Sequence, residues 1–147
     1  NTVNKLLAIN TEDSFTALDV SIIDLKNCSA DFIKYGAPYG FIISDQGIKI
    51  VEGNSLPLGI IDELKPSVCN TALNDGDMVL LITDGISDAF GSSLEIIDFL
   101  RTQSAKNPQT LADEILNKAI QLNGGLKKDD MTALAVRIYK RKNNLSA

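Results

Sequence analysis

The sequence contains no histidine and only two cysteines, Cys28 and Cys69, which lie far apart in the chain. The absence of histidine excludes a Ser-His-Asp triad, a Cys-His pair and a histidine-ligated zinc site formed by this chain alone. The two cysteines lack the spacing of a metal site, and we expect them to be reduced thiols in a cytosolic protein. Catalysis by this chain would therefore rest mainly on carboxylates, hydroxyls, lysines, arginines or backbone groups.

The chain also lacks a long basic block and a long apolar run. Its net charge is −5, and its one basic cluster, Lys140 to Lys142, lies near the C-terminal end, so we expect no nucleic-acid partner and no contact with an anionic membrane. No apolar run approaches the roughly 18 residues of a membrane span, and no signal-peptide pattern opens the sequence. We expect a location on the cytoplasmic side. If the parent protein is membrane-anchored, the anchor lies outside this chain.

The chain of 147 residues is 44% hydrophobic, enough for the core of one domain over residues 1–147. Apolar and alternating segments predict strands. These strands are Phe15–Leu25, Phe32–Tyr35, Gly40–Ser44, Ile48–Val51, Ser67–Ala72, Met78–Thr83 and Met131–Ile138. Helical spacing of apolar residues occurs weakly over Asn1–Ile9 and clearly over Leu94–Leu100 and Leu111–Ile120, with Ser92 or Ser93 as the cap of the second. Many antiparallel strands, two helices and a last strand make an α+β fold.

Acidic residues stand at the ends of two apolar strands. Asp84, in Thr83-Asp84-Gly85, follows the strand that begins at Met78, and Asp129-Asp130 precedes the last strand. Carboxylates gathered at neighbouring strand ends are hard oxygen ligands suited to Mg²⁺ or Mn²⁺, and Gly85 would let the chain turn sharply beside such an ion. From spacing alone, an ordinary Asp-Gly turn and a solvated acidic loop explain the same residues, and both interpretations stay open.

Other polar features have simpler explanations. The segments Gly36–Pro38 and Leu56–Gly59 are typical turns, and Asp24 is expected to face solvent, whereas the pattern does not place Asp19. The serines, Ser14 and Ser21 among them, have no base beside them in the sequence and are weak candidates for a nucleophile.

Five segments together resemble the phosphatase domain of the stage II sporulation protein E family. They occur in the family's order and at fitting distances across essentially the whole chain. The segments are Phe15–Leu25, Lys34–Pro38, Leu56–Ile60, Thr83–Ile86 and Asp129–Thr132. The wider group is the metal-dependent serine/threonine protein phosphatases, which includes the 2C-type enzymes and stress-response regulators of bacterial sigma factors.

The resemblance implies an αββα sandwich, in which two antiparallel sheets pack face to face with helices outside. It implies hydrolysis of phosphoserine or phosphothreonine on a protein, with two Mn²⁺ or Mg²⁺ ions held by aspartates and a bridging water that attacks phosphorus. Asp84 matches the family's Thr/Ser-Asp-Gly metal ligand, and Asp129 matches the aspartate of its Asp-Asn/Asp-Met motif. Asp130 occupies the neighbouring position and is the weaker candidate for a direct ligand.

The resemblance also implies a partner and a pathway. In sporulation the substrate is a phosphorylated anti-anti-sigma factor, whose dephosphorylation leads to activation of a compartment-specific sigma factor. The complete domain carries regulatory helices that form dimers, so a homodimer of the complete domain is implied as well.

The chain departs from the family pattern at its start. Nothing in it matches the family's upstream Asp-Gly metal motif, so we expect the C-terminal part of one phosphatase domain without its first third. Asp84 and Asp129 alone make a poor site for an ion that takes six oxygen ligands, and we expect weak Mn²⁺ binding and little activity from the chain alone. The alternatives are a non-catalytic scaffold or binding module of the same fold, and an unrelated α+β domain that binds a partner.

Overall fold

The computed structural model describes residues 2–9, 15–61, 63–103 and 106–139. The basic cluster Lys140 to Lys142 and the candidate serine Ser14 lie outside the described residues. Among those described, no helix has the length and the apolar character that a membrane crossing requires.

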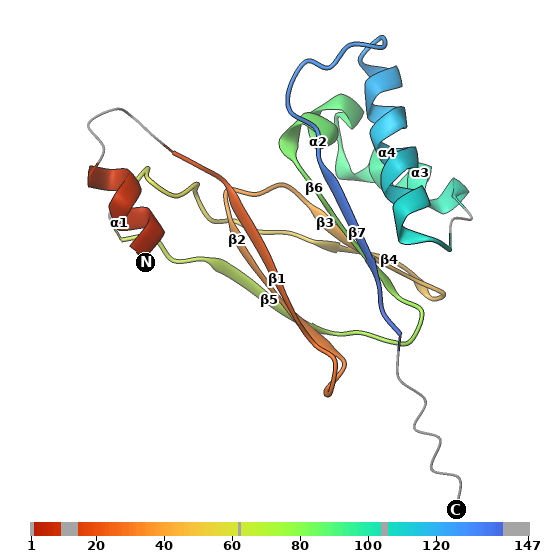
Figure 1. Cartoon of the computed structure of the whole chain (residues 1–147), viewed down its shortest axis with the longest axis horizontal. Coiled ribbons are helices and arrows are strands. Elements are labelled where there is room, and N and C mark those ends of the chain that lie inside the picture. Colours follow the sequence, from red (N-terminus) through yellow and green to blue (C-terminus); the bar gives the residue numbers. More distant parts are fainter. Residues whose placement is uncertain (1, 10–14, 62, 104–105, 140–147) are drawn as a thin grey trace, which may run out of the picture.

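Two antiparallel sheets form the body of the molecule (Figure 1). The first has the order β1-β2-β5, with β1 (Leu18–Asp24), β2 (Ser29–Tyr35) and β5 (Ser67–Ala72). The second has the order β4-β3-β6-β7, with β3 (Gly40–Ser44), β4 (Gly47–Val51), β6 (Met78–Ile82) and β7 (Ala133–Arg137). The strands β1 and β2, and likewise β3 and β4, follow one another in the chain and pair as antiparallel hairpins.

Three helices cover one face of the four-stranded sheet (Figure 1). They are α2 (Asp84–Phe90), α3 (Ser93–Thr102) and α4 (Pro108–Leu122). Ser92 caps α3 by accepting from the Glu95 N–H, which settles the predicted choice of cap, and Asn107 caps α4 ahead of Pro108. The weakly predicted first helix is α1 (Thr2–Ile9), and the Asn4 side chain ties it to Gly59 and Ile61.

The hydrophobic core has two parts, one on each face of the four-stranded sheet. Phe41 and Leu80 face the helices, where they pack with Ile86, Ile96 and Ile115. Between the sheets lies a second cluster of Ala30, Phe32, Ile42, Val51, Leu73, Val79 and Ile138. Strand β6 contributes to both parts and is buried on both faces, which is why its sequence is a continuous apolar run. The predicted sandwich of face-to-face sheets is confirmed.

Helix α2 was not predicted from the sequence. An ordinary Asp-Gly turn was one of the interpretations left open for Thr83-Asp84-Gly85, and it is wrong, because β6 ends at Ile82 and α2 begins at Asp84. Thr83 has extended backbone angles and stands at the N-cap position, and Ile86 and Phe90 bury the inner face of the helix. Their spacing is helical, but seven residues give a signal too short to distinguish from a turn.

The predicted exposure of Asp24 is confirmed. The carboxylate accepts first from the Asn27 N–H, and then from the Asn27 side-chain amide and the Lys26 N–H; these bonds hold the pKa of Asp24 below its ordinary value. Asp24 thus closes the β1-β2 turn and has no part in the site described next.

Candidate functional site

The fold brings the two acidic segments to one edge of the four-stranded sheet. Strands β6 and β7 are antiparallel neighbours, with Ile82 opposite Ala133. Asp84 follows the end of β6 and Asp129 precedes the start of β7, so both stand at the same edge of the sheet. The expectation that these strand ends lie close together is confirmed.

Thr83 fastens the two segments to each other. Its backbone N–H donates to the Thr132 carbonyl at 3.1 Å. Its hydroxyl accepts from the Thr132 N–H at 2.9 Å and donates to the Asp130 carbonyl at 3.1 Å. Thr83, which directly follows β6, therefore holds in place the loop that carries Asp129.

Gly85 lets the Asp129 loop lie directly against helix α2. A Cβ added at Gly85 would come within 2.5 Å of the Asp130 carbonyl oxygen and 3.3 Å of the Asp129 Cβ. The backbone of Gly85 is not in the left-handed region. The predicted sharp turn at this glycine is therefore wrong, and close approach of two backbones is what requires a residue without a side chain.

Each acidic side chain is fixed by the backbone next to it. The Gly85 N–H donates to Asp84 Oδ1 at 3.0 Å, and the Asp130 N–H donates to Asp129 Oδ1 at 2.8 Å. Both carboxylates are exposed. Their oxygens have the hardness that Mg²⁺ and Mn²⁺ prefer, so the donor chemistry fits such an ion. Among the described residues no group of three or more His, Cys, Asp or Glu could hold a metal ion, so the remaining ligands of a six-coordinate ion would come from elsewhere.

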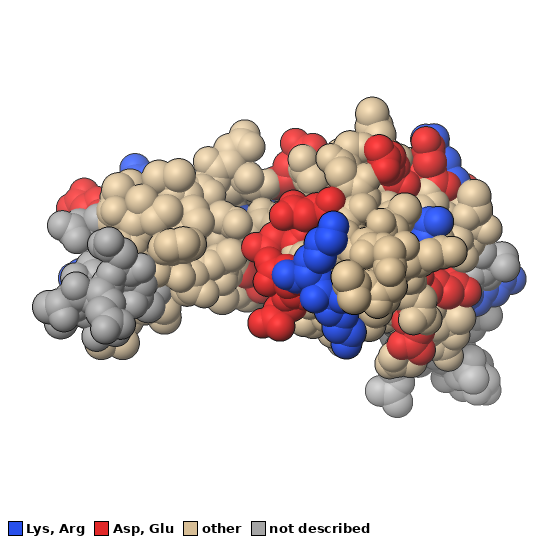
Figure 2. Space-filling view, turned by 90° about the horizontal axis from the view of Figure 1, so that it is seen from above, with Lys and Arg blue, Asp and Glu red and all other residues tan. Residues whose placement is uncertain are grey.

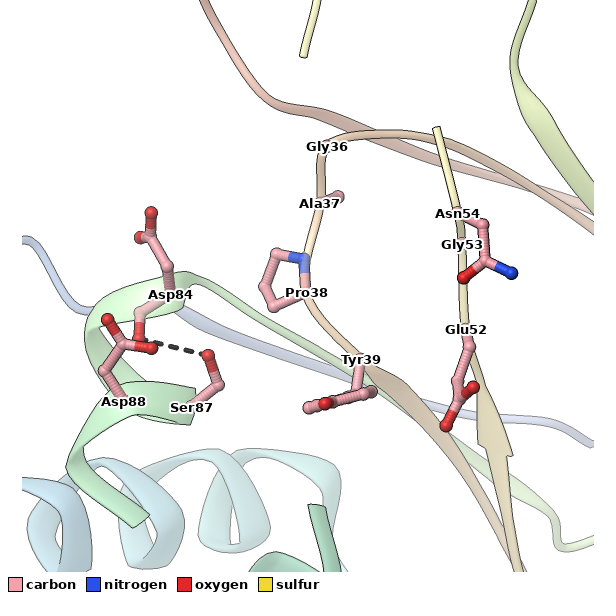
Figure 3. Close-up of a pocket in the computed structure, with 10 residues that line it drawn as sticks. All are labelled: Gly36, Ala37, Pro38, Tyr39, Glu52, Gly53, Asn54, Asp84, Ser87 and Asp88. Carbon is pink, nitrogen blue, oxygen red and sulfur yellow. Dashed lines mark hydrogen bonds between the residues drawn. The ribbon is translucent and has the colours of Figure 1, made fainter. Parts of the chain in front are cut away.

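A pocket of about 440 Å³ lies beside Asp84 (Figure 3). One side is the segment 36–39, a second is the segment 52–54 after β4, and the third is helix α2 with Asp84, Ser87 and Asp88. Asp129 is not among the lining residues. Figure 2 shows acidic side chains gathered in the middle of the face seen from above, with basic side chains beside them.

Sequence reasoning missed most of this pocket. Gly36–Pro38 was predicted as a turn and belonged to a segment that resembles the family, but it was given no part in a site, and Glu52 and Asp88 were not singled out. Asp88 lies one helical turn after Asp84 and would have followed from recognising α2, whose signal is the apolar set Ile86, Ala89 and Phe90. No local signal identifies Glu52, because only the pairing of β4, β3 and β6, in which Val51 and Leu81 both stand opposite Gly40, brings it to the edge where α2 begins.

Replacing Thr83 by valine tests the fastening of the two segments. Valine keeps the shape but removes the hydroxyl that bonds both Asp130 and Thr132, and we expect unfolding free energy to fall by about 1–3 kcal/mol. Thermal or urea unfolding measures this, with Thr83→Ser as the control that keeps the hydroxyl and should stay near the original stability. A valine variant as stable as the original chain would contradict the role assigned to the hydroxyl.

Comparison with known families gives one match that covers nearly the whole chain. Residues 1–139 match the family described as Stage II sporulation protein E (SpoIIE). The stage II sporulation protein E of Bacillus subtilis is 34% identical over 143 residues, a match that covers 93% of this chain and 17% of that protein. The chain thus spans about a sixth of the length of this relative.

Solved structures agree with the sequence match. The chain is similar to the phosphatase domain of the cell fate determinant SpoIIE from B. subtilis, presoaked with Mn, with a TM-score of 0.79 and 32% identity over 96% of this chain and 64% of that one. A structure of the PP2C phosphatase domain and a fragment of the regulatory domain of the same protein gives a TM-score of 0.86 at 32% identity, over 95% of this chain and 44% of that one.

Proposed function

The chain belongs to the stage II sporulation protein E family, and on that premise we propose that it is the C-terminal part of a metal-dependent phosphatase domain that hydrolyses phosphoserine or phosphothreonine on a protein. The observation that carries this proposal is the meeting of Asp84 and Asp129 at one sheet edge, beside a pocket that Asp84 lines. Membership of the family makes the interpretation as an unrelated α+β domain wrong.

In the proposed site Asp84 and Asp129 would hold Mn²⁺ or Mg²⁺, with two ions in the complete domain. When bound, such ions supply an activated water and offset the negative charge of the phosphoryl oxygens. The choice of manganese is supported by the Mn-presoaked crystals of the Bacillus subtilis phosphatase domain. The chain's own residues hold the two carboxylates in place through the Gly85 and Asp130 N–H groups and the Thr83 hydroxyl.

The pocket gives this chain a place for the substrate. Its walls are the segments 36–39 and 52–54, and Asp84 stands at its edge on α2. The chemistry needs no covalent bond to the enzyme, which suits a chain without histidine. The phosphorylated side chain would approach Asp84 from the pocket, with the rest of the substrate protein lying across the rim.

The substrate and the cellular setting are part of the same proposal. We propose a phosphorylated anti-anti-sigma factor as the protein substrate, acting in sporulation on the cytoplasmic side, with a homodimer formed by the complete domain. Membership of the stage II sporulation protein E family supports the pathway. An anchor of the parent protein in a membrane would belong to a segment outside this chain.

Phosphate release from a phosphoserine anti-anti-sigma protein tests the proposal. The chain would be assayed with Mn²⁺ beside a form extended upstream to the length of the solved phosphatase domain, of which the present chain spans 64%. We expect activity from the extended form, little from the chain alone, and only weak Mn²⁺ binding by the chain in calorimetry, because two carboxylates leave most of six positions unfilled. Tight binding by the chain alone would contradict that expectation. An extended form inert with metal present would favour the non-catalytic scaffold.

A further inference from the structure

We propose that Lys34 is a positioning residue that fixes two walls of the pocket and thereby sets how the phosphoprotein is held; this rests on the proposed function. Lys34 lies in β2, inside the sandwich, and only 1% of its side chain is exposed. Lysine is almost never fully buried unless its charge is paired. The contacts of Lys34 therefore indicate which parts of the structure the buried charge holds in place.

The ammonium group of Lys34 has two acceptors. It forms an ion pair with Asp19 Oδ2, on the neighbouring strand β1, where Asp19 stands directly opposite Lys34 in the register. It also donates to the Pro38 carbonyl at 2.7 Å. The Asp19 side chain is 16% exposed, so both charges are largely withdrawn from water. A pair at this depth holds its geometry firmly, since breaking it would leave an uncompensated charge.

Lys34 reaches both walls that face α2 across the pocket. Pro38, whose carbonyl it binds, belongs to the first wall. Gly53 belongs to the second, and a Cβ added there would lie 2.6 Å from the Lys34 Cβ and 3.0 Å from its Cδ. The stem of Lys34 therefore occupies the space that any side chain at residue 53 would need. One buried side chain thus sets the positions of both segments.

The first wall is also held from its other end. Gly36 has a φ of +59°, its N–H donates to the Ser55 carbonyl at 2.9 Å, and a Cβ there would come within 2.4 Å of Pro57. The segment 36–38 is thus tied at Gly36 by the chain after β4 and at Pro38 by Lys34. Without the lysine, Pro38 would lose its tie to the interior. The wall formed by the segment 36–39 would then no longer be held in a fixed position relative to Asp84 (Figure 3).

A fixed wall matters most for a large substrate. An aryl phosphate needs only Asp84, Asp129 and the metal that they would hold. A phosphoprotein must also place its chain against the pocket walls around the phosphorylated side chain. A change far from the reacting atoms that misplaces the bound substrate by about 1 Å can cost about 100-fold in rate. Loss of Lys34 should therefore weaken the reaction with the phosphoprotein much more than the reaction with a small phosphate ester.

The test uses the extended form with Lys34→Met, which keeps the length of the stem and removes the charge. We expect kcat/KM for the phosphoprotein to fall about 10- to 100-fold, mainly through KM, while kcat for an aryl phosphate with Mn²⁺ stays within about twofold. Lys49→Met is the matched control: this exposed lysine of β4 donates to Thr71 and lines no wall of the pocket beside Asp84, so both reactions should keep their rates.

The double variant Asp19→Leu/Lys34→Met separates positioning from simple stability. Replacing both charges by apolar groups removes the unpaired charge, and should restore folding if Lys34→Met alone folds poorly. We expect the double variant to stay selectively impaired with the phosphoprotein. Recovery of the phosphoprotein reaction together with stability, or an equal loss with both substrates, would overturn the role proposed for Lys34. An unaltered extended form that hydrolyses neither substrate would instead overturn the proposed function itself.

Discussion

Asp84→Asn in the extended form is expected to lower Mn²⁺-dependent phosphate release by at least about 100-fold. Asparagine keeps the size of the side chain and an oxygen able to accept from the Gly85 N–H, but it removes the negative charge that would hold the metal. Metal ions contribute several kcal/mol to stabilising charge in the transition state, and each 1.36 kcal/mol is a factor of about ten in rate. The measurement is kcat at saturating substrate over a range of Mn²⁺ concentrations.

Asp98→Asn is the control for this substitution. The substitution removes the same negative charge from α3, where the Asp98 side chain is 74% exposed and paired at the surface with Arg101. Surface pairs of this kind contribute about 0–1 kcal/mol, so activity and thermal stability should be unchanged. An Asp84→Asn variant that is folded and keeps more than about a tenth of the activity would remove Asp84 from the proposed metal site.

Where local chemistry decides the structure, the sequence was informative. The apolar run of β6, the strands β3 and β4 and the Ser92 cap each depend mainly on neighbours in the chain, and each was placed within one or two residues. The prediction that Asp84 and Asp129 share an edge needed only that the two strands they flank be antiparallel neighbours. Assigning a metal to them rested on the family resemblance, because Asp-Gly turns and acidic loops are common without metals.

The features that could not be predicted depend on contacts between distant segments. Asp19 could not be placed from its strand, because its partner Lys34 is met only when β1 and β2 pair in one register. Gly85 was expected to let the chain turn sharply, but a glycine is required there because the Asp130 backbone, in the loop before the neighbouring strand β7, comes so close. The sequence pattern indicates that a residue such as Asp19 or Gly85 is unusual at its position. Its structural role depends on the segment that packs against it.

Gly85→Ala is expected to lower both the free energy of unfolding and the Mn²⁺-dependent activity of the extended form. Alanine is the better helix former by about 1 kcal/mol, and Gly85 lies in the first turn of α2. Against this gain, its Cβ would stand 2.5 Å from a backbone oxygen that cannot rotate away, and overpacking of this kind costs about 1–3 kcal/mol. The clash is relieved only if the loop of Asp129 moves away from α2, so the extended form should lose about 100-fold in Mn²⁺-dependent activity.

Gly47→Ala separates loss of stability from loss of geometry. A Cβ at Gly47 meets nothing within 4 Å, but its φ of +132° strains any other residue by about 1–3 kcal/mol. Thermal unfolding should therefore show a similar cost for the two variants, while phosphate release measured well below the melting temperature should fall only for Gly85→Ala. Equal activities in the two variants would mean that Asp129 keeps its position without the close approach at Gly85, and that Thr83 alone is enough to hold the two acidic segments together.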